Sequence, residues 1–372
     1  MELFSIGILL VFVLYGLFSH HSKVATAGLL VLLYLLFAFE KSMGDYEGYL
    51  IMYDEIKSGF GRSNDYEILY VWSCATAAKF GLTFDQMRYV FCLFEVGLIY
   101  SVIRKYTKNT ALVLSLFIIF PALFEAELFR FLFGMTLVIY AIPFLFSFSV
   151  RGYITYFVFV VLAALFHTSC WIFLIYYLLA VKSRKKLIFI VASFVIVGSL
   201  TLGVGSVFGV LEKLPIREHV IDKYETGEYS NINGIIFSTS KLVLIFMLGV
   251  IATWGTLIYK KVELVNLPKV YRNSVLLNSR ILELNIISLL LIIPLYLSPN
   301  TQRLYHIIVF FNYIAVANAY LYKRKSIKTI SGFLVSLILL LYMLFLEGTG
   351  TVYAFVSHFT EGFLVNFAET FL

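Results

Sequence analysis

Apolar positions follow one another in long runs along almost the whole chain, and short polar segments separate these runs. Each run ends at charged residues or at Gly, Pro and Asn, and several approach the length of about 20 residues that a helix needs to cross a bilayer. The pattern predicts an all-α integral membrane protein, a polytopic bundle of about 12 membrane segments that forms a single domain over residues 1–372. The runs lie at 3–18, 24–39, 88–103, 110–124, 130–148, 153–181, 187–209, 238–259, 281–298, 304–322 and 329–346.

The composition excludes a soluble globular enzyme. Of the 372 residues, 61% are hydrophobic and 14% are charged, whereas a soluble domain carries about 25% charge. The net charge of +7 lies mainly in short loops between apolar runs, so we expect membrane lipid as its partner and no nucleic acid. The three cysteines are scattered and form no CxxC motif, which argues against a zinc site or a disulfide framework.

Basic residues mark one side of the predicted membrane domain. Lys and Arg cluster in several connecting segments, and the positive-inside rule places these segments in the cytoplasm. Two long acidic or mixed segments, 40–87 and 210–237, then become outer loops, and both chain termini face outward. The tail at 348–372 alternates aromatic residues with few charges and is predicted to be an interfacial C-terminal helix.

One apolar run has basic residues at both ends, which a single membrane helix would separate. Arg151 precedes the stretch 153–180 and a basic cluster at 182–186 follows it, and both basic ends belong on the inner side. The chain must therefore enter the membrane and return. Its only strongly polar point is His167 with the two hydroxyl residues after it, so the sequence predicts a broken or re-entrant hairpin around His167, with its turn toward the outer face.

The first outer loop is rich in acids and tyrosines. Carboxylates accept hydrogen bonds from hydroxyl groups, and aromatic rings stack on the C–H faces of sugars. Asp45, Tyr46, Tyr49 and Glu67 are therefore candidate residues of a sugar site. The alternative is a solvated acidic loop with an ordinary interfacial belt of tyrosines.

Three charged residues lie close together at the outer ends of two runs, in the segment PALFEAELFRFLFG. A charge near hydrocarbon costs roughly 2.5 to 3.5 kcal/mol on insertion scales, so Glu125, Glu127 and Arg130 require a physical reason. Glu127 and Arg130 lie three residues apart and can pair at a helix end. Alternatively, the planar guanidinium group of Arg130 contacts a phosphate in a bidentate manner.

A second arginine, Arg303, enters a later helix from the outer side, with Tyr305 and His306 shortly after it. If Arg303 faces Arg130, the two guanidinium groups form a clamp for a diphosphate; the alternative is snorkelling to lipid headgroups. His167 is a candidate general base because imidazole exchanges protons near neutral pH, although a lone His among apolar residues is more often structural.

Other polar residues lie inside the apolar runs. Glu95 is midway along its run and two helical turns from Arg88 on one face, which fits either a structural hydrogen bond or a proton or ion site. Asn285, Asn312 and Asn318 are expected to hydrogen-bond between helices.

Five short motifs follow one another along the chain: GDYEGY, DYEILY, FRFLFG, LAALFHTS and QRLYH. They all fall at the predicted outer side. In their order and placement the chain resembles the Wzy-type polysaccharide polymerases, especially their EpsG-like branch, over about residues 30–325. The R-x10-G pattern of some O-antigen polymerases is absent, since nine residues separate Arg217 from Gly227.

The resemblance implies a GT-C-like glycosyltransferase of the bacterial cytoplasmic membrane, with its active site toward the extracytoplasmic face. Such enzymes transfer a growing glycan from undecaprenyl diphosphate to a sugar hydroxyl of another undecaprenyl-diphosphate-linked repeat unit, for O-antigen, capsule or exopolysaccharide. We expect no cofactor and no metal ion. Together, the resemblance and the residue chemistry give a candidate site of His167, Asp45 and Glu67 for catalysis, Arg130 and Arg303 for the diphosphate, and Tyr46, Tyr49, Glu127 and Tyr305 for the substrate.

Other classes of protein fit part of the pattern. A lipid-linked oligosaccharide flippase or transporter should concentrate charge along a central cavity and often shows repeat symmetry, which this sequence does not display. An O-antigen ligase differs from a polymerase only in its acceptor, and a membrane acyltransferase would need a His accessible from the cytoplasm. A polymerase also allows a chain-length regulator and a flippase as protein partners.

Overall fold

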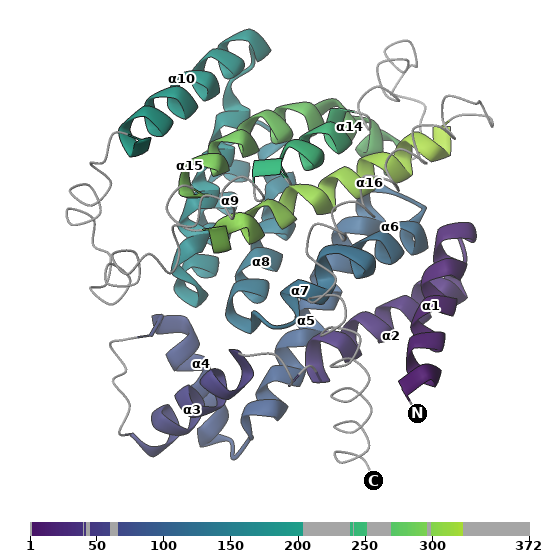
Figure 1. Ribbon diagram of the computed structural model, residues 1–372, viewed down its shortest axis with the longest axis vertical. Helices are drawn as coiled ribbons and strands as arrows, with labels where there is room; N and C mark the ends of the chain where they lie inside the picture. Colours follow the sequence, from purple (N-terminus) through teal and green to yellow (C-terminus); the bar gives the residue numbers. More distant parts are fainter. Residues whose placement is uncertain are drawn as a thin grey trace.

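The computed structural model describes residues 2–39, 41, 45–59, 66–203, 239–240, 242–250, 269–295 and 299–322, and all regular elements in these ranges are helices (Figure 1). The outer loop predicted at 210–237 and the tail predicted at 348–372 lie outside them. The first half contains α1 (Glu2–Phe18), α2 (Lys23–Phe39), α3 (Asp45–Ser58), α4 (Ile68–Lys79), α5 (Phe84–Tyr106), α6 (Thr110–Phe117), η2 (Ile118–Ala122), α7 (Leu123–Glu125), α8 (Phe129–Leu145), α9 (Val150–Phe166) and η3 (Thr168–Ala180). The second contains α10 (Arg184–Gly203), α14 (Lys269–Ser288), η6 (Leu289–Leu291), α15 (Ile292–Leu295), η7 (Pro299–Tyr305) and α16 (His306–Tyr322).

Two helical stretches in the described ranges are long and apolar enough to cross a membrane: Phe84–Tyr106 and Arg272–Pro294, each of 23 residues. At 1.5 Å per residue each is about 34 Å long, against a hydrocarbon core of about 30 Å. Several shorter apolar helices of 10–17 residues accompany them. These helices support a helical membrane protein; the number of crossings and the GT-C-like arrangement stay predictions.

The predicted outer loop at 40–87 contains two helices. α3 and α4 form most of it, and they lie together at one end of the molecule beside the start of α5 (Figure 1). α5 begins at Phe84, four residues before the predicted run, because Thr83 and Gln86 form a capping box that satisfies backbone N–H groups at the helix start.

A small aromatic core attaches this end to the helix bundle. Tyr49 of α3, Tyr70 of α4, Phe84 of α5, Phe129 of α8 and Phe166 of α9 are all buried in it. The rings of Phe84 and Phe129 meet edge to face with their centroids 5.9 Å apart, a favoured geometry for aromatic pairs. The core therefore fixes α3 and α4 against three helices of the bundle.

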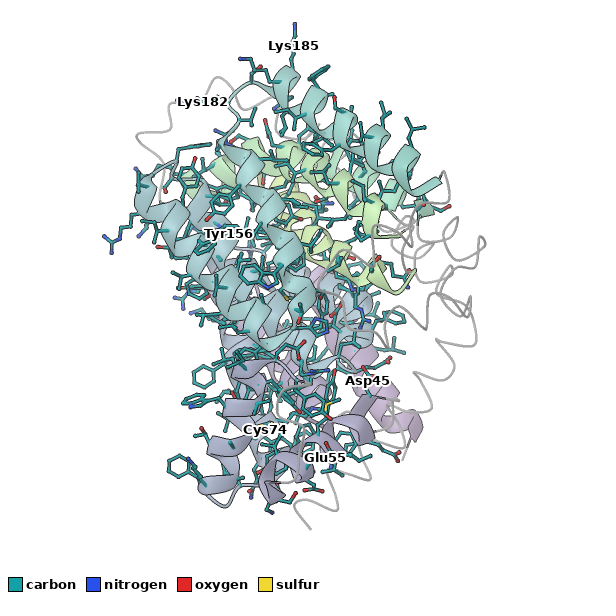
Figure 2. All side chains as sticks on the ribbon, turned by 90° about the vertical axis from the view of Figure 1, so that its left-hand side faces the viewer. Asp45, Glu55, Cys74, Tyr156, Lys182 and Lys185 are labelled. Carbon is teal, nitrogen blue, oxygen red and sulfur yellow. The ribbon has the colours of Figure 1, made fainter. Side chains whose placement is uncertain are left out.

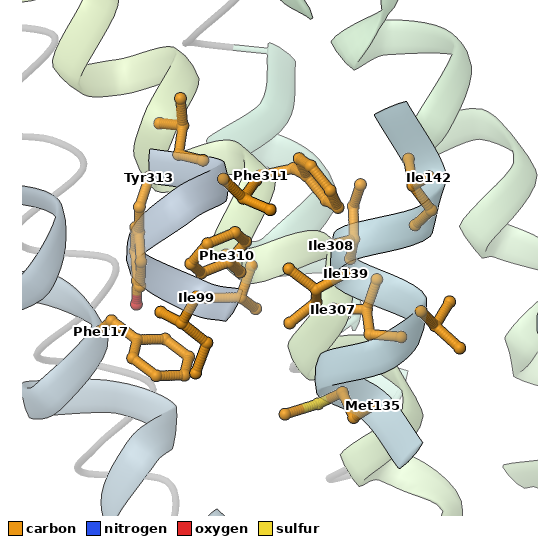
Figure 3. Packing of buried hydrophobic residues seen from close by; sticks show 14 of the residues in the cluster. Ile99, Phe117, Met135, Ile139, Ile142, Ile307, Ile308, Phe310, Phe311 and Tyr313 are labelled. Carbon is orange, nitrogen blue, oxygen red and sulfur yellow. The ribbon is translucent and has the colours of Figure 1, made fainter. Parts of the chain in front are cut away.

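The main apolar core connects helices that are distant in the sequence. Ile99 of α5, Phe117 of α6, Ile139 of α8 and Phe310 of α16 are buried and packed in one cluster (Figure 3). The rings of Phe117 and Phe310 meet edge to face at 5.5 Å. Because this cluster contains both early and late helices, it holds the two parts of the chain together.

The hairpin predicted around His167 is confirmed. α9 ends before His167 and η3 begins after it, and the backbone of His167 is extended. The hydroxyl of Tyr156 donates to the carbonyl of Phe173 at 2.6 Å, and that of Tyr177 donates to the carbonyl of Tyr153 at 2.7 Å. These contacts show that the two segments run antiparallel.

Gly134 permits α8 to pack closely against this hairpin. A Cβ atom at Gly134 would lie 2.7 Å from Sγ of Cys170 and 3.2 Å from the carbonyl oxygen of Ala163. The glycine of the FRFLFG motif therefore has a packing role, and it allows Arg130 at the start of α8 to approach the turn at His167.

The predicted role of the buried asparagines is also confirmed. The side-chain amides of Asn285 and Asn312 donate to each other at 2.7 and 3.1 Å, and Asn312 also donates to the carbonyl of Ile245. Asn318 donates to the side chain of Asn278 at 3.1 Å. These contacts join α14 to α16 by hydrogen bonds between helices.

The sequence predicts an apolar run at 281–298 that follows a basic inner loop. The structure differs from this prediction in the bounds and the charge of α14. The helix already begins at Lys269 and carries charged residues along its length. Glu283 is accommodated because Arg184, at the start of α10, donates two hydrogen bonds to one of its carboxylate oxygens, at 2.8 and 3.1 Å. The hydropathy of the segment could not reveal a partner 99 residues away.

One basic segment and one acidic segment lie at opposite ends of the molecule. Figure 2 shows Lys182 and Lys185 at one end, and Asp45 and Glu55 near the other. The sequence assigns these two segments to opposite sides of a membrane, and the fold separates them along the long axis of the molecule.

Candidate active site at the end of the helix bundle

Glu67 and Arg130 form the centre of a charged cluster at the end of the bundle that carries α3 and α4. Oε2 of Glu67 accepts a hydrogen bond from Nη1 of Arg130 at 2.5 Å, although the two residues lie 63 positions apart in the sequence. Oε1 of Glu67 accepts from both the backbone N–H and the hydroxyl of Thr168, at 3.2 and 3.1 Å. One carboxylate therefore ties the start of α4 to the starts of α8 and η3.

Aromatic rings enclose the guanidinium group of Arg130. Its Cζ atom lies 5.3 Å from the ring centroid of Tyr49 and 5.2 Å from that of Tyr70, which are cation–π distances. The Nε atom of Arg130 is buried and has no hydrogen-bond partner in the part of the chain that the structure describes. Arg130 thus retains a donor that an anionic ligand could use.

His167 and Arg303 meet the cluster through one aromatic ring. The ring of Phe131 lies edge to face with that of His167 at 5.5 Å, and Cζ of Arg303 lies 5.7 Å from the centroid of Phe131. Nδ1 of His167 is 2.7 Å from the hydroxyl of Ser169, which fixes the imidazole in the turn between α9 and η3. The structure therefore brings together the three groups on which the predicted mechanism depends, Arg130, Arg303 and His167.

Electrostatics set the protonation of the cluster. Burial alone would raise the pKa of Glu67, but Arg130, His167 and the backbone N–H of Thr168 lower it, and the pKa falls below its ordinary value. The pKa of His167 is lowered to about 4, mainly by desolvation; the guanidinium groups of Arg130 and Arg303 also lower it, and Glu67 opposes the change. Near neutral pH, Glu67 is a carboxylate and the imidazole of His167 is neutral.

The predicted outer tyrosines and acids divide between two places. Tyr49 lies in the cluster, and desolvation is the largest cause that raises the pKa of its hydroxyl. Tyr46 instead donates to Oδ1 of Asp85 at 2.9 Å, and Lys41 binds the other oxygen of Asp85 at 2.7 Å. Asp45, the first residue of α3, is exposed, and its charge is close enough to affect Tyr49.

Two further predicted substrate residues occupy different surroundings. Glu127 is half-buried in the turn between α7 and α8, three residues before Arg130. Tyr305 is buried, and its hydroxyl donates to the carbonyl of Leu291 at 2.8 Å. This contact gives Tyr305 a structural role in holding η7, and its role toward the substrate stays a prediction.

Sequence reasoning missed several members of the site. Tyr70 lies three residues after Glu67 in the DYEILY motif, and this helical spacing was the available signal that both face Arg130. The contact between Glu125 and His306 was also missed, because nothing local pairs residues that lie 181 positions apart. Within the described ranges, no group of three or more His, Cys, Asp and Glu side chains is arranged to hold a metal ion.

The fold and the site define a helical membrane protein with a charged, aromatic-lined cluster at the end opposite its basic segment. The chain belongs to the EpsG family, whose match covers residues 4–358. This family indicates a function of the polysaccharide polymerase type, with glycosyltransferase-like activity, and it confirms the resemblance drawn from the motifs. No curated protein and no solved structure matches the chain.

Proposed function

We propose that the protein is a GT-C-like membrane glycosyltransferase that polymerises undecaprenyl-diphosphate-linked repeat units of a surface polysaccharide. The observation that carries this proposal is that His167 and Arg303 both meet the ring of Phe131, and that the guanidinium groups of Arg130 and Arg303 both lie close enough to act on the imidazole of His167. Two guanidinium groups beside a neutral imidazole supply charge for a diphosphate and a base for a hydroxyl group. Family membership supports the same general activity.

The proposed reaction is a single displacement at the anomeric carbon of the donor glycan. The bond between this carbon and the diphosphate oxygen breaks, the acceptor hydroxyl oxygen forms the new glycosidic bond, and undecaprenyl diphosphate leaves. Arg130 and Arg303 stabilise the negative charge that develops on the leaving diphosphate. A single displacement inverts the configuration at the anomeric carbon.

His167 is the group that we propose takes the proton of the acceptor hydroxyl. Its imidazole is neutral near pH 7 and can therefore accept a proton. A bound diphosphate next to it adds negative charge, which favours the protonated imidazole. Glu67 is a poorer base because both of its oxygens already accept hydrogen bonds, so its role is to hold Arg130. Asp45, which is exposed, remains available to bind the acceptor sugar.

We further propose that this end of the molecule faces the extracytoplasmic side of the bacterial cytoplasmic membrane. The basic segment around Lys182 and Lys185 lies at the opposite end (Figure 2), and the positive-inside rule assigns such segments to the cytoplasm. The lipid-linked substrates are then presented at the outer leaflet. A cysteine placed at Asp54 should react with an impermeant reagent from outside, whereas one at Lys185 should not.

Replacement of each arginine tests the function in cells. In Arg130→Ala and Arg303→Ala strains, single lipid-linked units should accumulate, and the surface glycan should form one band in place of a ladder on a gel. Lys185→Ala, at the opposite end, is the matched control and should give the normal ladder. A normal ladder in both arginine variants would overturn the diphosphate clamp. Complete loss of surface glycan in a deletion strain would favour the flippase.

A further inference from the structure

A buried acid–imidazole pair lies close to the cluster in the sequence but was not part of the predicted mechanism. Glu125, the last residue of α7, has no exposed surface, and its Oε1 atom contacts Nδ1 of His306, the first residue of α16. His306 is also buried, and its ring meets that of Phe120 edge to face at 5.1 Å. Oε2 of Glu125 has no hydrogen-bond partner among the described residues.

The pair joins the two chain segments that carry the arginines of the site. Glu125 lies five residues before Arg130, and His306 lies three residues after Arg303, about one helical turn. The two segments are otherwise distant in the sequence. A contact between Glu125 and His306 therefore restricts how far the two guanidinium groups can separate.

Because both side chains in this contact are buried, the presence of an acid and an imidazole there needs a physical reason. Polar groups removed from water cost free energy unless they are paired, and replacing a buried ion pair by well-packed apolar residues is often neutral or stabilising. Packing between α7 and α16 alone would therefore not require an acid and an imidazole. A directional contact, in contrast, fixes the orientation of the two segments and not only their proximity.

From this arrangement we infer that Glu125 and His306 are a positioning pair that sets the separation and orientation of Arg130 and Arg303, so that both reach one diphosphate. The inference rests on the proposed function. Neither side chain needs to touch the substrate. Their effect passes through the arginines, because a misplacement of about 1 Å can reduce turnover about 10²-fold.

The test uses the purified full chain in lipid, with lipid-linked repeat units extracted from the host as substrate, and measures kcat and KM separately. His306→Phe keeps a ring but removes the contact, and it should lower kcat about 10²-fold with a small change in KM. His306→Asn keeps a donor near the position of Nδ1 and should recover most of the kcat. His21→Phe, an exposed histidine elsewhere, should match the wild type.

A second pair of variants covers the case in which His306→Phe does not fold. Glu125→Gln keeps the size of the side chain and should lower kcat, His306→Ala removes the imidazole and should lower it as well, and the double variant should lose little more than either single variant, since both changes remove one contact. Additive losses would overturn the inference. So would wild-type kcat in both His306→Phe and Glu125→Gln.

Arg303→Ala separates the inference from the function on which it rests. If Arg303→Ala keeps normal turnover, the diphosphate clamp itself is wrong. If Arg303→Ala is inactive while the Glu125 and His306 variants have normal kcat, the clamp stands and the positioning role is wrong.

Discussion

Glu67 and Glu95 are two carboxyl groups largely removed from water in the same protein, and their surroundings differ in kind. Glu67 accepts hydrogen bonds from Arg130 and Thr168 and joins three elements. Glu95, midway along α5, has no exposed surface, and neither of its oxygens has a hydrogen-bond partner in the described ranges. Arg88, on the same helix, is two turns away and donates to the carbonyl of Ala126.

The difference shows which of the two buried carboxyl groups is organised as a charged carboxylate. A buried carboxylate is stable only with partners, so Glu67 is organised as an anion that holds Arg130 in place. A buried carboxyl group without partners is more stable as the neutral acid. The cluster at the end of the bundle is therefore an electrostatic site, whereas Glu95 lies on the buried face of a membrane-length apolar helix.

The strongest test of this difference removes the carboxylate of the site. Glu67→Ala leaves Arg130 as an unpaired, largely buried charge, and it should lower turnover about 10²-fold and the free energy of unfolding by about 3 kcal/mol. Polymer length on a gel and thermal melting in detergent measure the two effects. Glu47→Ala, an exposed acid on α3, is the control. Normal polymer and melting in Glu67→Ala would mean that its contacts are incidental.

A smaller change keeps the charge of Arg130 and alters its shape. Arg130→Lys retains one positive charge but loses the planar fork that can bind Glu67 and a phosphate together, so turnover should fall about 10-fold while stability changes by less than about 1 kcal/mol. Arg184→Lys alters the pair with Glu283 at the opposite end and should leave turnover unchanged. Equal turnover in Arg130→Lys and the wild type would show that only the charge matters.

The sequence predicts those features of the fold that depend on a local pattern. The apolar runs predict most of the helices, and the basic residues at both ends of one run predict the hairpin at His167, because each signal lies within one segment. The motifs also identified Arg130, Arg303 and His167 as neighbours in function. The fold brings His167 and Arg303 to the ring of Phe131, and the charges of Arg130 and Arg303 both act on His167.

Pairings across the fold could not be predicted in the same way. The sequence does not show which basic residue pairs with Glu67, because Arg130 lies 63 positions away and only the packing of α4 against the bundle brings the two together. Tyr46 and Tyr49 belong to the same motif and lie about one turn apart on α3. Tyr46 nevertheless contacts Asp85, whereas Tyr49 contacts Arg130. Such choices depend on tertiary contacts, and hydrophobic periodicity carries no information about them.

The next prediction concerns Glu95 and should give a smaller effect. If Glu95 is a neutral acid, Glu95→Gln is nearly isosteric and should change stability by less than about 1 kcal/mol, with turnover unchanged. The same assays of melting and polymer length apply, with Glu47→Gln as the exposed control. A Glu95→Gln protein that inserts correctly, melts as the wild type does and makes no polymer would show that Glu95 belongs to the reaction.

The smallest expected effect is a difference in pH dependence between the wild type and Glu67→Gln. The pKa of Glu67 is lowered from its ordinary value of 4.5. The ion pair therefore stabilises the folded protein at pH values above the pKa of Glu67 in the unfolded chain. This contribution is lost as the pH falls through the lower pKa of Glu67 in the folded protein.

Melting temperatures measured from about pH 7 to about pH 3 should show that the advantage of the wild type over Glu67→Gln shrinks toward the acidic end. Glu47→Gln should follow the wild type throughout. Parallel curves for the wild type and Glu67→Gln would mean that the contacts of Glu67 do not favour its charged form, and the electrostatic distinction from Glu95 would then be lost.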